Sequence, residues 1–220
     1  MTIIILSLSI LVLFITLANV LFWPRVTDSL ERVPGAVSVL IPARNEEANL
    51  VDCLSRVVAQ GAVVGEILVY DDHSTDNTAA LIEAAQAADP RIRLVPTRQL
   101  EPGWTGKNFA CSRLAEASRS PYILFLDADA RLQPGAIDNI LHEMRRRRLE
   151  LLSCWPGLIT ETFWERVLMP MLNFVVFSIY PGPLSLFFSY PSLALAHGAC
   201  MMFDRRSYMA IGGHSAVRDQ

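Results

Sequence analysis

The stretch Tyr122-Ile-Leu-Phe-Leu-Asp127-Ala-Asp129-Ala-Arg131 runs large apolar residues directly into two carboxylates that flank one alanine. A short apolar run of this kind predicts a buried strand that ends near Asp127. Oxygen atoms from a pair of acids suit Mg²⁺ or Mn²⁺, with phosphate oxygens and water completing the coordination. A D-x-D pair alone is also typical of a turn or a helix cap. Its meaning therefore depends on the segments around it.

Strand-like and helix-like segments alternate on both sides of this stretch. Apolar, β-branched runs predict strands, and apolar residues at helical spacing predict helices. The expected strands are 37–44, 65–72, 92–97 and 122–129, and the expected helices are 45–61, 74–89, 108–119 and 134–148. Ser74 or Thr75 is the expected N-cap of the second helix, and Pro134 is expected to open the last. The alternation indicates an α/β fold with a mainly parallel, Rossmann-like sheet and helices on both faces.

Polar residues follow the ends of these expected strands. Asn45-Glu46-Glu47 follows the first strand, and Asp71-Asp72 follows the second. Ligands of open parallel sheets bind beyond the carboxyl ends of the strands, so we expect these acids to meet Asp127 and Asp129 at one edge. Acids at that place can accept hydrogen bonds from a nucleoside base or ribose. Asp76 and Thr78 are expected to cap and pin the following helix.

The turn GWTGKN, Gly103 to Asn108, invites comparison with a phosphate-binding loop. It does not match one, because that loop needs four residues between its glycines and a hydroxyl after the lysine. A lysine that opens a helix can still present its ammonium group to an anion, and Lys107 is therefore a candidate contact for phosphate or donor sugar. An exposed lysine after a turn is the equally simple alternative.

Apolar residues make up 52% of the chain, which is high for a soluble protein, and the excess lies in two blocks. The first, Thr2–Trp23, has no charge, and about 20 such residues span a bilayer as a helix. A signal peptide is the alternative, but no Lys or Arg precedes the block and no small-residue cleavage site follows it. We therefore expect an anchor over 1–24 and a linker over 25–36. Arginines follow the anchor and none precedes it, which predicts one span in the cytoplasmic (inner) membrane with the remaining chain facing the cytoplasm.

The second apolar block, 167–203, also has no charge, but four prolines interrupt it. Because proline breaks helices and aromatic residues suit the headgroup boundary, a re-entrant or interfacial pair of helices is expected here. A hydrophobic lid over the active site is the alternative.

Composition excludes some other classes of function. A net charge of -3 gives no general basic surface for nucleic acid. The four cysteines form no C-x-x-C pair, which favours ordinary buried thiols in a reducing compartment over a metal site or a disulfide framework. They are Cys53, Cys111, Cys154 and Cys200.

Five segments, in this order, resemble the family 2 glycosyltransferases with a GT-A fold. They are VSVLIPARNEE, ILVYDDHSTDNT, PGWTGKNFACSRLAEAS, YILFLDADARLQPGAI and HGACMMFDRRSYMAIGGHSAVRDQ, which are spread over Val37 to Gln220. The third and fourth are most similar to the membrane-associated branch that contains carotenoid- and hopanoid-associated glycosyltransferases. The resemblance implies a nucleotide-sugar-binding GT-A domain over 37–160. It also implies a membrane-proximal, acceptor-side segment over 161–220.

The implied activity is inverting transfer of a hexose from a nucleotide sugar, with a UDP-sugar favoured, to an isoprenoid-type lipid at the cytoplasmic membrane face. Mg²⁺ or Mn²⁺ is the implied cofactor. A donor-binding module that lacks the catalytic base is the alternative outside enzymes. A nucleotidyltransferase is disfavoured, because PARNEE stands where such enzymes carry a Gly-rich basic loop.

The resemblance assigns roles to individual residues. The implied donor side is Pro42, Ala43, Arg44, Asn45, Glu46, Asp72 and Asp127. Asp71, which precedes Asp72, and Lys107, a candidate from its place at a helix start, are expected to join it. The metal motif is Asp127 and Asp129, with Asp129 as the more direct ligand. The acceptor side is His197, Gly198, Ala199 and Arg206, followed by Gly212-Gly213.

The catalytic base departs from the family pattern. The resemblance implies an acid in a Glu-Asp pair shortly after Gly213, but Asp219 is the only acid there and it precedes Gln220. A terminal segment is expected to fray and to hold a base poorly. We therefore expect a truncated sequence with its base beyond Gln220, and Asp219 is a weaker candidate.

Overall fold

The computed structural model describes residues 1–29, 31–188 and 190–220, and it divides into two compact units. The apolar unit contains Met1–Arg25 and Pro156–Ala196, and the sheet unit contains Val26–Trp155 and His197–Gln220. Sequence patterns group 161–220 into one segment. In the structure, the last part of that segment belongs to the sheet unit, because it supplies a strand.

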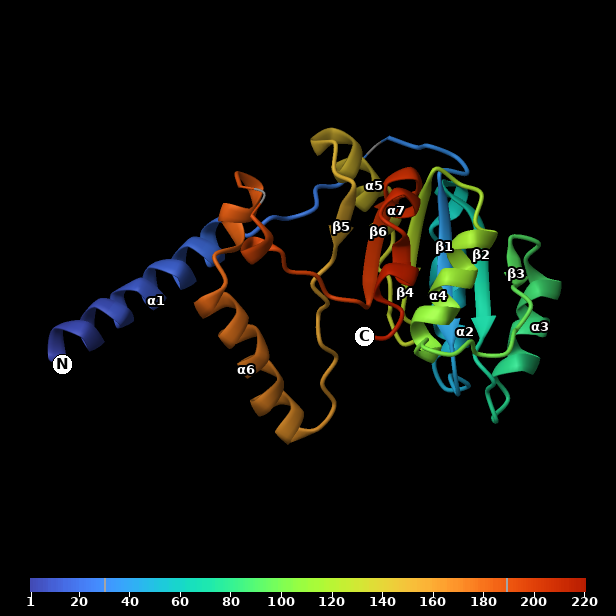
Figure 1. Ribbon diagram of the computed structural model, residues 1–220, viewed down its shortest axis with the longest axis horizontal. Coiled ribbons are helices and arrows are strands. Elements are labelled where there is room, and N and C mark those ends of the chain that lie inside the picture. Colours follow the sequence, from blue (N-terminus) through green and yellow to red (C-terminus); the bar gives the residue numbers. More distant parts are fainter. Residues whose placement is uncertain (30, 189) are drawn as a thin grey trace. The chain divides into compact units, whose positions relative to one another are not determined.

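A six-stranded sheet forms the centre of the sheet unit, in the order β3-β2-β1-β4-β6-β5 (Figure 1). Its strands are β1 Val37–Ala43, β2 Val64–Asp71, β3 Ile92–Leu94, β4 Tyr122–Leu126, β5 Leu151–Ser153 and β6 Cys200–Asp204. The pairs β1/β2, β1/β4 and β2/β3 are parallel, whereas β6 runs antiparallel to both β4 and β5. The expected mainly parallel sheet is confirmed. Strands β5 and β6 add an edge that the sequence patterns did not predict.

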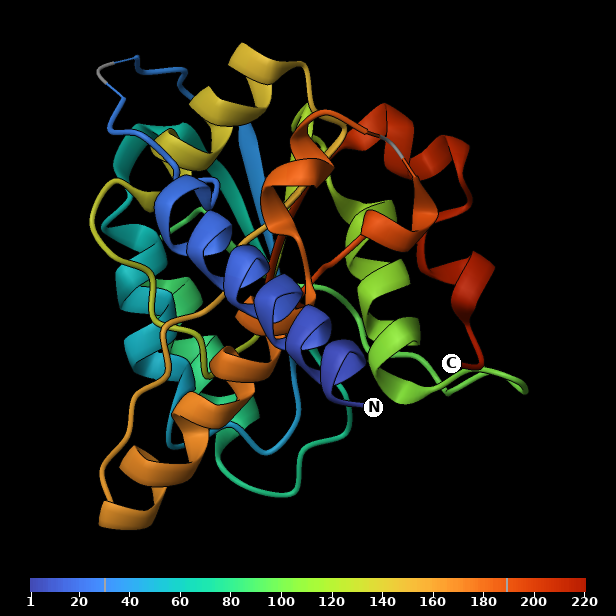
Figure 2. The same cartoon turned by 90° about the vertical axis from the view of Figure 1, so that its left-hand side faces the viewer.

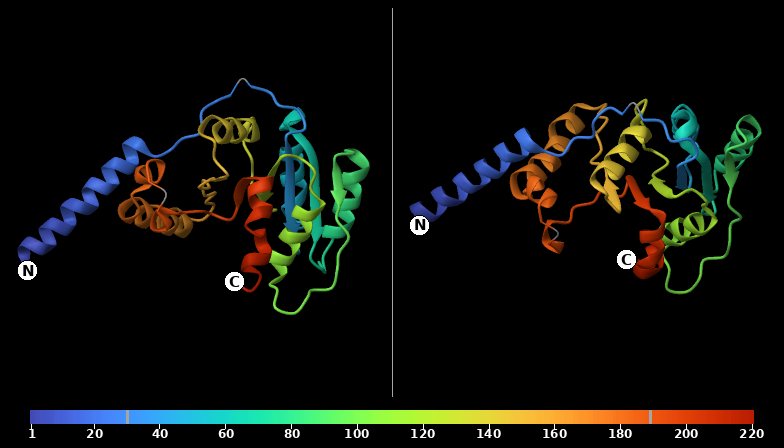
Figure 3. Two further views of the ribbon diagram at one scale, coloured as in Figure 1. Left: turned by 45° about the horizontal axis from the view of Figure 1, so that its top comes forward. Right: turned by 90° about the horizontal axis from the view of Figure 1, so that it is seen from above.

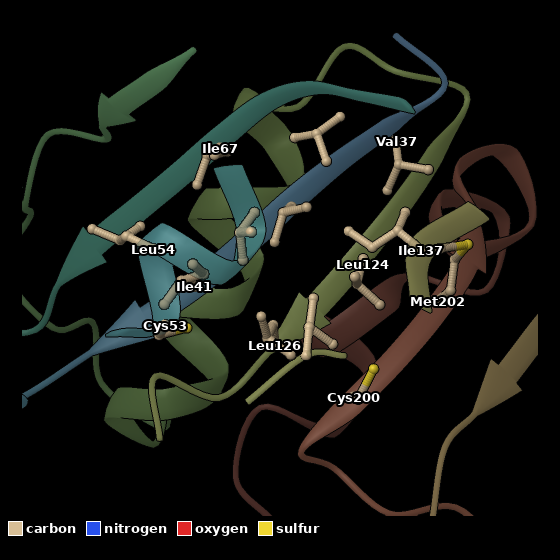
Figure 4. Close-up of a cluster of buried hydrophobic side chains, with 14 of the residues drawn as sticks. Val37, Ile41, Cys53, Leu54, Ile67, Leu124, Leu126, Ile137, Cys200 and Met202 are labelled. Carbon is tan, nitrogen blue, oxygen red and sulfur yellow. The ribbon is translucent and has the colours of Figure 1, made fainter. Parts of the chain in front are cut away.

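Helices cover both faces of this sheet, as the α/β pattern predicts. They are α2 Leu50–Val58, α3 Thr78–Ala88, α4 Gly106–Ala117, α5 Ala136–Arg147 and α7 Arg205–Ala210, with 3-10 turns η1 Gly61–Val63 and η4 Gly213–Val217. Side chains alternate across a strand. Leu124 and Leu126 of β4 therefore join the cluster under α2 and α5, whereas Ile123 and Phe125 join the cluster under α4 and α7. Figure 4 shows the first cluster, with Cys200 and Met202 of β6 beside the β4 leucines.

Two helix starts differ from the sequence expectation. Helix α3 begins at Thr78 with Asn77 at its N-cap position, instead of Ser74 or Thr75. The Ser74 side chain does not cap the helix, because its hydroxyl donates to the Asp71 carboxylate at 2.5 Å. Helix α5 begins at Ala136, after Gly135 takes the left-handed conformation, so Pro134 precedes the helix.

The apolar unit contains α1 Thr2–Phe22, α6 Phe163–Ile179, and the 3-10 turns η2 Gly182–Leu186 and η3 Pro191–Leu193. Helices α1 and α6 contact each other near their C-terminal ends, and Figures 2 and 3 show the two helices from different sides. Asn19 of α1 is fully buried there, and its amide donates to the carbonyl of Phe177 at 2.7 Å and to that of Tyr180 at 2.6 Å. The ring of Trp23 stacks on Phe177. One polar side chain therefore ties the apolar helix to the second apolar block.

Helix α1 has the length and composition of a membrane span, with a mean hydropathy of 2.7, and its large apolar side chains are mostly exposed. Helix α6 starts at a capping box, in which Thr162 accepts from the Glu165 N–H and the Glu165 side chain accepts in return. It continues through Pro170, although proline removes one backbone hydrogen bond. In place of the expected pair of helices, the described part of this block contains most of α6, two short 3-10 turns and the start of β6.

Candidate functional site

A cavity of about 340 Å³ opens at the carboxyl ends of β1, β2 and β4. Of the residues predicted to bind the donor or the metal, all line it except Asn45 and Asp71. The lining is Pro42, Ala43, Arg44, Glu46, Asp72, Gly106, Lys107, Ala110, Asp127, Ala128 and Asp129. Acids from three separate strand ends therefore converge at one edge, as the sheet topology requires.

The loop after β1 is fixed by the loop after β2. Asn45 has a positive φ of 56°, a conformation that asparagine tolerates better than most residues. Its side-chain oxygen accepts from the Thr75 N–H at 2.8 Å, and its own N–H donates to the Ser74 hydroxyl at 2.9 Å. These bonds hold the PARNEE segment against its neighbour.

Asp76 and Thr78 complete this connection, in agreement with their expected pinning role. The Asp76 carboxylate accepts from the Thr78 N–H at 3.0 Å and from the Glu47 N–H at 3.1 Å. The Thr78 hydroxyl in turn accepts from the Glu46 N–H at 2.8 Å. Hydrogen bonds from Thr78 lower the pKa of Asp76. The backbone of Glu46, which lines the cavity, is thereby fixed to the start of α3.

Adjacent acids at the end of β2 have different surroundings. Asp71 faces its own turn, where its carboxylate accepts from the Ser74 N–H and hydroxyl, and it does not line the cavity. Asp72 does line it, with its side chain 13% exposed and Arg44 at 3.4 Å. Of the two residues predicted to contact the nucleoside, the structure brings only Asp72 to the cavity.

Gly106 is a cavity residue that sequence reasoning missed. A Cβ atom at this position would lie 2.5 Å from a carboxylate oxygen of Asp72, so any larger residue would require the Asp72 carboxylate to move. The second glycine of GWTGKN is therefore explained by the close contact between the start of α4 and the end of β2. A small residue at the start of a helix was the only signal in the sequence.

Asp127 and Asp129 stand directly beyond β4. The Asp127 N–H donates to the carbonyl of Ala199 at 3.0 Å, and its carboxylate accepts from the Lys107 ammonium group at 2.6 Å. The Asp127 side chain is 28% exposed. Asp129 is exposed, and among the described residues none donates a hydrogen bond to its carboxylate or pairs with it. One acid of the motif is thus held by a cation, and the other is open to solvent.

Burial and nearby charges shift the pKa values of Cys53 and His214, and the acids of this edge contribute to the first shift. Burial raises the pKa of Cys53 to about 12, and the charges of Asp129, Asp52, Glu46 and Asp127 raise it further. Burial, with a smaller contribution from the Lys107 charge, lowers the pKa of His214 to about 4. A positively charged ligand or ion would relieve the repulsion among these acids.

The donor atoms at this edge suit a hard divalent cation. In the described part of the chain no three His, Cys, Asp or Glu side chains are grouped closely enough to hold a metal by themselves. Mg²⁺ typically uses one or two carboxylates together with substrate phosphates and water. Asp127 and Asp129 supply oxygen ligands of that kind, so the residues fit such an ion when a diphosphate accompanies it.

The acceptor-side residues divide between the two ends of the sheet. Ser153 fixes His197, because its hydroxyl accepts from the His197 N–H at 2.7 Å, and Ala199 bonds Asp127 directly. Gly198 lies between them. Arg206 does not join this group: it follows β6, which runs antiparallel and ends with Asp204 opposite Tyr122, at the other end of β4.

The last described residues are attached to the start of α4. The Thr105 N–H donates to the carbonyl of Arg218 at 2.8 Å, and the Asn108 amide donates to those of Val217 and Gln220. The segment was expected to fray. Instead, it is held because the Asn108 side chain donates to two of the segment's carbonyls. The Asp219 side chain is exposed and does not line the cavity.

Comparisons with known proteins agree with this architecture. The profile of the family described as Glycosyl transferase family 2 matches residues 38–212. The 4,4'-diaponeurosporenoate glycosyltransferase of Staphylococcus haemolyticus (strain JCSC1435) is 29% identical over 181 residues, which are 81% of this chain and 47% of that protein. The protein of the same name from Staphylococcus aureus (strain USA300) is 27% identical over 189 residues, with coverages of 83% and 47%. The chain therefore spans about half the length of these curated relatives.

Two solved structures share the fold. A mannosyltransferase, PcManGT from Pyrobaculum calidifontis, in complex with GDP-Man and Mn²⁺, superposes with a TM-score of 0.66 at 20% identity, covering 94% of this chain and 57% of that one. The M. tuberculosis glucosyl-3-phosphoglycerate synthase gives a TM-score of 0.53 at 20% identity, covering 84% and 64%. At such identities the likeness concerns the fold alone, and it confirms the predicted GT-A architecture.

Proposed function

Since this chain belongs to glycosyl transferase family 2, we propose that it transfers a hexose from a nucleotide sugar to an isoprenoid-type lipid at the cytoplasmic face of a membrane. The observation that carries the proposal is the convergence of Asp72, Lys107, Asp127 and Asp129 on one cavity. A nucleoside needs hydrogen-bond acceptors, and a diphosphate needs positive charge. This cavity supplies both within one set of strand ends.

The proposed donor roles follow the chemistry of each side chain. Asp72, held close to Gly106, accepts hydrogen bonds from the nucleoside. Lys107 exchanges its contact with Asp127 for the diphosphate, because a doubly charged phosphate competes well for an exposed ammonium group. Pro42 and Ala43 form the wall of the nucleoside site, with Arg44 and Glu46 at its rim. A UDP-sugar is the favoured donor.

Asp127 and Asp129 are proposed to hold Mg²⁺ or Mn²⁺, which would neutralise charge on the departing diphosphate. The acceptor oxygen attacks the anomeric carbon as the bond from that carbon to the diphosphate breaks, which inverts the configuration. The acceptor's proton passes to a catalytic base, for which the resemblance implies an acid shortly after Gly213. His197, Gly198 and Ala199 are proposed to border the acceptor, because Ala199 is bonded to Asp127.

A lipid acceptor is supported by two independent features. The two relatives named above are glycosyltransferases named for 4,4'-diaponeurosporenoate. Helix α1 is long and apolar enough to cross a bilayer, which is where an insoluble acceptor is found. The arginines that follow α1 support a cytoplasmic catalytic side.

Calorimetry and a transfer assay test this proposal together. The full chain in detergent is titrated with UDP-glucose and with GDP-mannose, each with and without Mn²⁺, and then incubated with labelled UDP-glucose and 4,4'-diaponeurosporenoate. We expect Mn²⁺-dependent binding of UDP-glucose and a labelled lipid product of inverted configuration. Binding without transfer to a lipid would identify a donor-binding module instead, and no binding of either nucleotide sugar would refute the proposal.

A further inference from the structure

Two of the four cysteines face each other across antiparallel strands. The register of β5 and β6 pairs Leu151 with Phe203 and Ser153 with Met201, so its continuation places Cys154 opposite Cys200. The backbone agrees, since the Cys154 N–H donates to the carbonyl of Cys200 at 2.9 Å. Opposite residues in such a pair have Cα atoms about 5.5 Å apart, within the range that a disulfide needs.

The two side chains also lie on the same side of these strands. Cys200 belongs to the buried cluster shown in Figure 4, and Cys154 packs against that cluster. The thiols are close enough to share a hydrogen bond, and the bond from Cys200 lowers the pKa of Cys154. Cys154 is half-buried whereas Cys200 is buried, which makes Cys154 the more accessible sulfur. The expectation of buried thiols holds for Cys53, Cys111 and Cys200, whereas Cys154 is only half-buried.

We propose that Cys154 and Cys200 are a site of reversible disulfide formation by a peroxide. The Cys154 thiol loses its proton and the thiolate attacks one peroxide oxygen. The O–O bond breaks, a sulfenic acid forms, and the departing hydroxide takes up that proton and leaves as the first water. The Cys200 sulfur then attacks the Cys154 sulfur, the S–O bond breaks, and a second water leaves with the Cys200 proton. Two thiols lose two electrons, and one hydrogen peroxide is reduced to two waters.

Cys154 and Cys200 lie close to the two points where the chain leaves and re-enters the sheet unit. These points are Trp155 and His197. A disulfide would close a loop that contains all of Pro156–Ala196 and would fix both of its connections to the sheet. It would also fix the start of β6 next to Ala199, whose carbonyl accepts from the N–H of Asp127. Small oxidants regulate cytoplasmic proteins through such transient bonds.

The other two cysteines provide internal controls. Cys53 on α2 and Cys111 on α4 are buried in clusters on opposite faces of the sheet, so they cannot bond each other. Burial raises the pKa of each to about 12, which makes both slow to react. Peroxide should therefore leave these two thiols reduced.

Mass spectrometry of the full chain in detergent tests the proposal. Reduced protein is treated with a small excess of hydrogen peroxide and then denatured in the presence of N-ethylmaleimide, which labels free thiols. Trypsin then cleaves after Arg166 and so separates Cys154 from Cys200. We expect most molecules to lose the mass of two hydrogen atoms, to yield a Cys154–Cys200 cross-linked peptide, and to carry maleimide only on Cys53 and Cys111. Dithiothreitol should restore all four maleimide sites.

Variants sharpen the result. Cys154→Ser should abolish the cross-linked peptide, whereas Cys53→Ser and Cys111→Ser should retain it. The wild-type peptide map is decisive even where a buried variant fails to fold. Maleimide on both Cys154 and Cys200 after peroxide treatment would overturn the proposal, and so would a bond between two chains or a sulfinic acid at Cys154.

Discussion

The sheet has a charged hollow at each end, and the two hollows differ in how their acids are satisfied. At the amino ends of β1, β2 and β4, a cavity of about 540 Å³ is lined by Gly35, Gly65, Glu66, Pro90, Arg91, Arg93, Arg119, Ser120 and Pro121. At the carboxyl ends, the cavity of about 340 Å³ carries Asp72, Asp127 and Asp129. Both contain acids and cations, yet only the second is proposed to bind a ligand.

Glu66 at the amino end is fully engaged. Its carboxylate accepts from the Ser38 hydroxyl at 2.7 Å, from the Arg119 N–H at 2.6 Å and from the Arg93 guanidinium at 2.5 Å. Burial opposes its ionisation, but the hydrogen bonds from Ser38, Arg93 and Arg119 outweigh burial and lower its pKa. Asp129 at the carboxyl end is exposed and has no such donor among the described residues. The hydrogen bonds of Glu66 indicate a structural role. The exposed Asp129 carboxylate, which lies beside a cavity, is free to bind a ligand.

Asp129→Asn should give the largest effect. Loss of a metal ligand removes charge stabilisation from the transition state, so transfer should fall by about 1,000-fold while the melting temperature stays unchanged. Steady-state transfer and thermal unfolding measure both. The matched control is Glu83→Gln, an exposed acid on α3 away from the cavity, which should leave both unchanged. If Asp129→Asn transferred sugar within twofold of the wild-type rate, Asp129 would not be a ligand needed for catalysis.

Glu66→Ala should have the opposite profile. It leaves the Arg93 and Arg119 donors and the Ser38 hydroxyl without their acceptor, so the free energy of unfolding should fall by about 3 kcal/mol. Transfer measured well below the melting temperature should remain close to wild type. Urea unfolding checks the first expectation, with Glu83→Ala as the exposed control at below about 0.5 kcal/mol. A selective loss of transfer would show that the amino end contributes to catalysis.

Lys107→Met should have a smaller effect than Asp129→Asn. The ammonium group is exposed and contributes one charge to diphosphate binding, so the apparent affinity for the donor should weaken by about tenfold. Binding of the free nucleoside, which lacks phosphate, should not change. Calorimetry with UDP-glucose and with uridine separates the two, and an equal loss for both ligands would contradict the phosphate role.

Glu66→Gln should give the smallest effect, and one that depends on pH. The pKa of Glu66 in the folded protein lies below its ordinary value of 4.5, so ionisation of Glu66 stabilises the fold above that pH. The stabilisation declines as the pH falls through the lowered pKa. The difference in melting temperature between wild type and Glu66→Gln should therefore be constant near neutral pH and shrink below pH 4.5. If the difference in melting temperature grew on acidification, the pKa of Glu66 in the folded protein would be raised and not lowered.

Local patterns predicted the parallel part of the sheet and the convergence of its acids. Strands β1, β2 and β4 are long apolar runs, and parallel strands bring their carboxyl ends to one edge whatever the details of the loops. Asp72, Asp127 and Asp129 could therefore be grouped from the sequence. Which of two adjacent acids faces the cavity could not, because Ser74, by hydrogen bonding, turns Asp71 away.

Long-range pairing explains the other differences. Strand β5 has only three residues and β6 pairs antiparallel with β4, and neither property has a local signal. The antiparallel direction of β6 separates Arg206 from His197, although the two are close in sequence. The pairing of β6 with β5 brings Cys154 opposite Cys200, which spacing alone does not predict.

Electron paramagnetic resonance of Mn²⁺ tests directly whether Asp127 and Asp129 bind a metal ion together with the donor. The free Mn²⁺ signal is followed as the full chain is added, with and without UDP-glucose, for the wild type and for a variant that combines Asp127→Asn with Asp129→Asn. The account predicts that the wild type removes Mn²⁺ from solution only together with UDP-glucose, and that the double variant does not. Equal binding of Mn²⁺ by both proteins would contradict it.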